Sequence, residues 1–94
     1  GKNMDSFKYT NGSASALIRT GGGIVEGVIV NTHTSGTMKL WDNTSAAGTV
    51  ITNTFTFPAG SGMYKFPEPV AFYTGLYFTV GGTLDYTIIW SPTS

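Results

Sequence analysis

The sequence predicts an all-β protein, either a compact antiparallel β-sandwich of jelly-roll-like form or a small β-barrel, with about eight short strands. Three observations support this prediction. No segment places apolar residues at the i, i+3, i+4 and i+7 positions of an amphipathic helix. Residues that favour strands and turns dominate, with fifteen Thr and 13 Gly in the chain of 94 residues. Short alternating runs are separated at short intervals by clusters of Gly, Pro, Asn and Ser.

The strand-like runs define the expected elements. In chain order, the expected strands are 14–19, 23–31, 36–42, 49–57, 63–66, 70–73, 76–80 and 83–90. The first run ends at the Gly21-Gly22 break. The second run is nearly apolar on both sides, which is typical of a central strand or of one covered by a partner. In the third run, Met38 and Leu40 share one face and Trp41 lies on the other.

The later runs alternate in the same way. Phe55 and Phe57 lie opposite the Thr side chains of their run, and Pro67 and Pro69 indicate an edge strand because Pro lacks a ladder donor. The last two runs present two apolar series to the core, Leu76, Phe78 and Val80, and then Leu84, Tyr86, Ile88 and Trp90. Between these two runs, Gly81-Gly82 predicts a tight hairpin, since Gly adopts the positive φ that such turns require.

Length and composition indicate one domain, 13–94, preceded by a loosely structured N-terminal arm, 1–12. The net charge is zero and only 11% of residues are charged, with the five basic residues scattered. Nucleic acid is therefore not an expected partner, because no basic stripe would follow a phosphate backbone. A membrane is not expected either, since no apolar run approaches the roughly 20 residues of a bilayer span. With no Cys for disulfides, self-association is the remaining source of additional buried area.

The chain offers little that resembles catalytic machinery. His33 is the only imidazole and lies in a polar segment, so we expect an exposed turn residue and no enzymatic activity. One His and no Cys also predict no metal site and no cofactor. Glu26 interrupts an apolar strand, and we expect it to face solvent or to pair with Arg19 across a hairpin. Asp42 and Asn43 are expected to bond to their own loop backbone, as in Asx turns.

Aromatic residues are the enriched feature, at 14% of the chain. Trp41, Tyr73 and Tyr77 fall on faces opposite the presumed core, where they would cap the rim of the core or form an interface. A carbohydrate platform is a more distant alternative. Together with the doubly apolar strand, these side chains give a candidate interface of Val25, Ile29, Trp41, Tyr73 and Tyr77.

From Gly27 onward, about two thirds of the chain resembles small virion proteins of tailed bacteriophages. The most specific part is the stretch Leu40-Trp41-Asp42-Asn43-Thr44-Ser45-Ala46-Ala47-Gly48-Thr49-Val50-Ile51, followed distally by Thr74-Gly75-Leu76-Tyr77-Phe78-Thr79-Val80-Gly81-Gly82-Thr83. The resemblance implies a capsid decoration (cement) protein, or a small subunit at a vertex, fibre or tail. It transfers no catalytic residues.

These observations together predict a non-enzymatic viral structural protein that decorates or stabilises a phage capsid through protein–protein contacts. The implied partners are further copies of the chain, with a trimer favoured, and the major capsid protein, and the implied location is the virion, at the capsid surface. The alternative is a β-module of a phage fibre or spike that binds carbohydrate or a host receptor through Trp41, Tyr73 and Tyr77.

Overall fold

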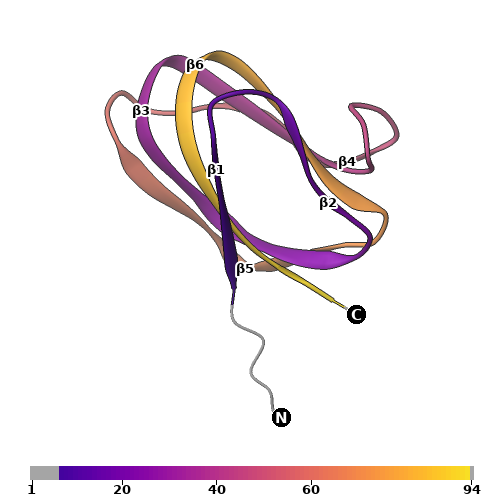
Figure 1. The fold of residues 1–94 in the computed structure, drawn as a ribbon. Coiled ribbons are helices and arrows are strands. Elements are labelled where there is room, and N and C mark those ends of the chain that lie inside the picture. Colours follow the sequence, from indigo (N-terminus) through magenta and orange to yellow (C-terminus); the bar gives the residue numbers. More distant parts are fainter. Residues whose placement is uncertain (1–6, 94) are drawn as a thin grey trace.

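The computed structural model describes residues 7–93, which form one antiparallel sheet without helices in that part of the chain. The strands are β1 (Lys8–Gly12), β2 (Ala16–Thr20), β3 (Gly23–Asp42), β4 (Thr49–Thr56), β5 (Gly62–Phe72) and β6 (Gly75–Pro92). β3 and β6 run side by side as the long central pair, as Figure 1 shows. The all-β prediction is confirmed.

Both central strands bend sharply at the same level. The bend in β3 passes through Ser35, which has a φ of 51°, and the bend in β6 passes through Gly82, with a φ of 68°. The β3–β6 ladder continues on both sides of the bend, from Thr34 opposite Thr83 to Thr37 opposite Gly81. The predicted hairpin at Gly81-Gly82 is therefore wrong. The glycine does supply a positive φ, but it bends one continuous strand because the partner strand bends with it.

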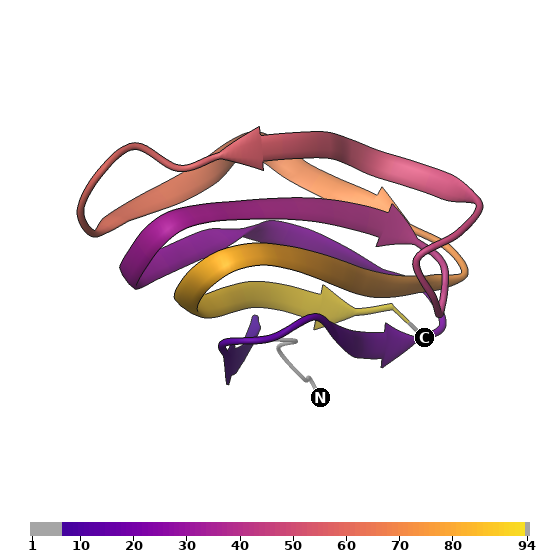
Figure 2. The ribbon, with the colours of Figure 1, turned by 90° about the horizontal axis from the view of Figure 1, so that it is seen from above.

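The bends fold the sheet into two layers, as the nested strands in Figure 2 show. Layer A contains β2, residues 75–80 of β6, residues 36–42 of β3, and β4, in that order. Layer B contains β1, residues 83–92 of β6, residues 23–33 of β3, and β5. Strands that pass from one layer to the other in this way are known from sandwiches with corners. Each layer has four strand segments. Their total agrees with the expected number of about eight strands, although the expected strands omit β1 and divide β5 into two.

Of the two predicted architectures, sandwich and barrel, the structure adopts the sandwich. Within residues 7–93 no ladder joins β4 to β5, so the sheet does not close into a barrel. The core lies between the layers and consists of the inward residues of both. In layer A these include Met38, Leu40, Leu76 and Phe78, and in layer B they include Val25, Val28, Val30, Leu84, Tyr86 and Ile88. The faces predicted from alternation in the last two runs are therefore confirmed. The Phe78 and Tyr86 rings meet across the layers with centroids 5.9 Å apart.

Two boundaries differ from the sequence-based expectation. Residues 8–12, assigned to the arm, form β1 and pair with β6 from Lys8–Trp90 to Gly12–Tyr86; residues 1–6 lie outside the described part of the chain. Expected strands 63–66 and 70–73 are one strand, β5. Among the described residues β5 pairs only with β3 and is thus an edge strand, as its prolines indicated. The β3–β5 ladder is interrupted at Glu26, since Val25 pairs with Val70 and Gly27 pairs with Lys65. Residues 66–69 of β5 therefore bulge opposite the single residue Glu26 of β3.

Candidate functional site: two outer faces and a seam

The outer face of layer A carries an apolar row that crosses all four strands. The ladders place Leu17 of β2 opposite Tyr77 of β6, Tyr77 opposite Trp41 of β3, and Trp41 opposite Val50 of β4. Residues directly opposite each other in an antiparallel pair share a face of the sheet. We call these four residues the aromatic row. Its ends are exposed, with 45% of Leu17 and 37% of Val50 accessible, and its centre is half-buried.

Neighbouring polar groups hold the centre of the aromatic row in place. The indole Nε1 of Trp41 donates a hydrogen bond to Thr79 Oγ1 at 3.2 Å. The Lys39 ammonium lies 4.3 Å from the centroid of the Trp41 ring, a cation–π contact that covers one face of the indole. Trp41 is thus fixed in orientation, and the row presents a preformed surface whose chemistry suits apolar contact with another macromolecule.

The outer face of layer B carries a second apolar surface, which includes a hollow. Two ladder rows run across β1, β6, β3 and β5 in that order: Tyr9, Ile89, Gly27 and Lys65 form the first, and Asn11, Thr87, Ile29 and Met63 form the second. A hollow of about 260 Å³ lies on this face at Gly27, rimmed by Ile29, Met63, Ile89 and the pair Glu26 and Lys65. We call it the outer hollow.

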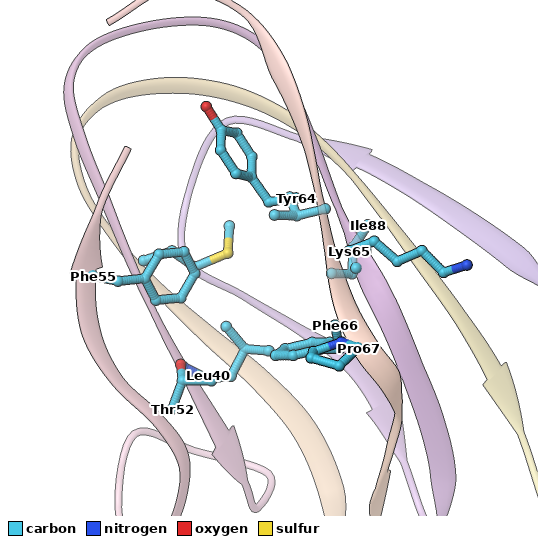
Figure 3. Close-up of a pocket in the computed structure, with 11 residues that line it drawn as sticks. Leu40, Thr52, Phe55, Tyr64, Lys65, Phe66, Pro67 and Ile88 are labelled. Atoms are coloured by element: carbon cyan, nitrogen blue, oxygen red, sulfur yellow. The ribbon is translucent and has the colours of Figure 1, made fainter. Parts of the chain in front are cut away.

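A third feature is a cavity of about 250 Å³ between the layers, on the side where β4 and β5 approach without pairing. Figure 3 shows side chains from both layers around it. Its lining is mainly apolar and includes Val28, Met38, Leu40, Phe55, Phe66 and Ile88. Thr52, which also lines it, accepts the Leu40 backbone N–H at 3.2 Å. This seam cavity offers apolar burial, and its lining contains the charged residue Lys65 but no acidic residue to act with it.

The five candidate interface residues occupy four different environments. Trp41 and Tyr77 lie side by side in the aromatic row, and Ile29 lies on the opposite outer face beside the outer hollow. Tyr73 lies in the turn between β5 and β6, with 78% of its surface exposed. Val25 has no exposed surface, which corrects its selection as a surface residue. It belongs to the core because the β3 bulge at Glu26 and Gly27 turns Val25 and Val28 to the same side.

His33 is not the exposed turn residue that the sequence predicted. It lies within β3, and its Nδ1 accepts the Gly36 backbone N–H at 2.9 Å. The other ring nitrogen, Nε2, lies 2.6 Å from the Pro58 carbonyl oxygen and donates to it when Nδ1 is the acceptor. The ring also packs against Phe57, with centroids 5.9 Å apart. Both ring nitrogens are engaged with the backbone, so the role that the structure gives this residue is structural.

The acidic residues also have local partners. Glu26 pairs with Lys65 at 3.1 Å, which corrects the expected partner: Arg19 instead donates to the carbonyl oxygens of Gly22 and Thr93. Glu26 pairs with Lys65 because Gly27 has no side chain and allows β5 to approach β3 closely. This approach places Lys65 beside Glu26. The Asn43 side chain bonds within its own loop, to Thr44 N and Ala47 O, as predicted.

Within residues 7–93, no three His, Cys, Asp or Glu side chains are grouped as metal ligands would be. The same part of the chain contains no helix that is long and apolar enough to span a membrane. The chain matches no protein-family model, no curated protein and no solved structure.

Sequence reasoning missed several residues of the two outer faces. Leu17, Val50, Met63 and Tyr9 are apolar or aromatic and exposed, yet no apolar series along their own strands marks them as part of an outer face. The signal that groups them is the strand register, which a single sequence does not contain.

Proposed function

We propose that this protein is a non-enzymatic viral structural protein that decorates or stabilises a phage capsid through protein–protein contacts made by the outer faces of its sandwich. The observation that carries the proposal is the aromatic row. It crosses a four-stranded layer and ends in exposed Leu17 and Val50. Trp and Tyr concentrate in protein interfaces because they bury large areas at low entropic cost.

A second apolar surface on the opposite face of the same small domain strengthens the proposal. A subunit with two adhesive faces can contact the shell with one and a neighbouring copy with the other. The rigid ladder framework and the low charge suit that task, since few charges would need to be desolvated on binding. The resemblance of the region from Gly27 onward to small virion proteins supplies the viral part of the proposal. The proposed partners are therefore a major capsid protein and further copies of this chain.

The alternative, a glycan- or receptor-binding module, is less well supported by the site. A sugar-binding platform needs an aromatic ring with an accessible face. Lys39 covers one face of the Trp41 ring, and Trp41 and Tyr77 are both half-buried on the sheet. Tyr73, the third aromatic of that alternative, lies in the β5–β6 turn and outside the aromatic row.

The test is quantitative mass spectrometry of purified particles of the virus that encodes the chain. We expect hundreds of copies per particle for a capsid-surface protein; a handful would place it at a tail or vertex, and complete absence would refute the proposal. Particles lacking the protein should then bind purified wild-type chain but not the Leu17→Lys or Val50→Lys variant. Tyr73→Glu, which also introduces a charge at an exposed position but lies outside the aromatic row, is the matched control. Affinity for glycans in an array without affinity for particles would support the alternative.

A further inference from the structure

The outer face of layer B combines a projecting residue and a hollow at complementary positions. Tyr9 on β1 is 70% exposed and lies directly opposite Ile89 of β6. On the other side of Ile89, the ladder reaches Gly27, where the outer hollow lies, and then Lys65. One row of the sheet thus carries an aromatic projection at one end and, two strands away, a largely apolar recess.

We propose that this face is the contact between two copies of the chain, related by a two-fold axis that runs parallel to the strands and lies between the two faces. Such an axis reverses the order of the strands, so that β1 of one copy lies over the β3–β5 half of the other. Tyr9 of each copy then enters the outer hollow of its partner, against Ile29 and Met63. An isologous contact of this kind uses the same patch twice and closes as a dimer. The inference rests on the self-association part of the proposed function and not on attachment to a shell.

The chemistry of the patch fits a second copy. The charged side chains at the rim of the outer hollow are Glu26 and Lys65, which already neutralise each other at 3.1 Å. At the outer hollow, two identical faces therefore meet without opposing unpaired like charges. Met63, with 77% of its surface exposed, has a flexible apolar side chain that can adapt to an incoming ring. Tyr9 can bury its ring in the recess, where its hydroxyl, at the tip of the side chain, meets the polar part of the lining at Glu26 and Lys65.

The size of the face sets the strength of the contact. Four strands about 4.8 Å apart, with five to ten residues of about 3.3 Å each, give roughly 300 to 600 Å² per copy. The total is at most about 1,200 Å², at the low end for specific complexes. We therefore expect a reversible dimer with a dissociation constant in the micromolar range.

Sedimentation velocity of the full chain, from low micromolar to several hundred micromolar, tests the proposal. The wild type should pass from monomer to dimer, and its melting temperature should rise with concentration. Met63→Glu and Tyr9→Ala should each weaken the dimer at least tenfold, with an unchanged β-type circular dichroism spectrum. Tyr73→Glu replaces a residue of almost the same exposure away from this face and should dimerise as the wild type does. Monomer at every concentration, a trimer, or a dimer that Met63→Glu leaves intact would each overturn the proposal.

Crosslinking gives an answer that does not depend on the stability of the variants. Because the chain has no Cys, single cysteines can be introduced without side reactions. Tyr9→Cys chains mixed with Met63→Cys chains should form crosslinked heterodimers with a short bismaleimide, whereas Tyr73→Cys mixed with Met63→Cys should not. Particle binding separates this proposal from the proposed function. If particles bind Met63→Glu normally, the shell contact is independent of the dimer; a wild-type dimer that no particle binds would refute only the shell contact.

Discussion

The Asp42 carboxylate at the end of β3 accepts the backbone N–H of Thr74 at 2.8 Å and so ties the β5–β6 turn to the layer A segment of β3. The same carboxylate accepts the N–H groups of Tyr73 at 3.0 Å and Gly75 at 3.3 Å. One side chain thus satisfies three successive backbone donors of a turn that links the two layers. The sequence predicts that both Asp42 and Asn43 hydrogen-bond to the backbone of the loop that follows them. Asn43 does so, whereas Asp42 bonds to the β5–β6 turn.

Asp42→Ala should lower the free energy of unfolding by about 1 to 3 kcal/mol, because three backbone donors lose a charged acceptor at a partly exposed site. Asp42→Asn, which keeps one carbonyl oxygen for Thr74, should lose clearly less. Urea denaturation of the three proteins measures the difference. Equal stability of Asp42→Ala and the wild type would show that water replaces the carboxylate without cost.

His33→Ala should destabilise the fold by about 1 to 2 kcal/mol, since it removes two hydrogen bonds of the imidazole to the backbone. The exposed-turn interpretation predicts a change within about 0.5 kcal/mol. Thermal unfolding distinguishes the two values. Thr34→Ala, at an exposed position next to the same bend, is the control and should be nearly neutral.

Gly82→Ala should be strongly destabilising, by roughly 3 kcal/mol or more, because two penalties combine. The φ of 68° disfavours a side chain, and an added Cβ would clash with the Ser35 carbonyl oxygen. Gly60 provides a matched control, since it has a φ of 91° but nothing within 4 Å of the added Cβ. Gly60→Ala should therefore lose only about 1 to 2 kcal/mol from the unfavourable φ. Similar losses in the two variants, measured by urea denaturation, would argue against close packing at the bend.

Alkaline pH should destabilise the protein through Tyr86. Burial raises the pKa of the Tyr86 phenol above its ordinary value of 10.0, and its hydroxyl donates to the Ala14 carbonyl oxygen at 2.9 Å. The pKa is higher in the folded state than in the unfolded state, so the contribution is fully present below pH 10 and is lost as the pH rises through the folded-state value. Tyr86→Phe should remove this part of the alkaline slope in stability. The exposed Tyr73→Phe should leave it unchanged, and stability measured between neutral pH and about pH 11 makes the comparison.

The sequence by itself determined the all-β class and the inward faces of the strands. Alternation is a local property, fixed by the geometry of an extended chain, so the inward positions of Leu84, Tyr86 and Ile88 could be predicted without knowledge of any partner strand. Local turn chemistry was informative in the same way, since it identified the positive φ of Gly82 and the Asn43 loop.

The tertiary structure alone decided what those local features build. Whether Gly82 closes a hairpin or bends a continuous strand depends on β3, which lies far away in the sequence and bends at the same level. The aromatic row joins Leu17, Trp41, Val50 and Tyr77 from four strands, and the outer hollow lies where a bulge places Gly27 between Ile89 and Lys65. Register and bulges arise from long-range pairing, where a shift of one residue turns every following side chain to the other face, and local periodicity contains no information about that choice.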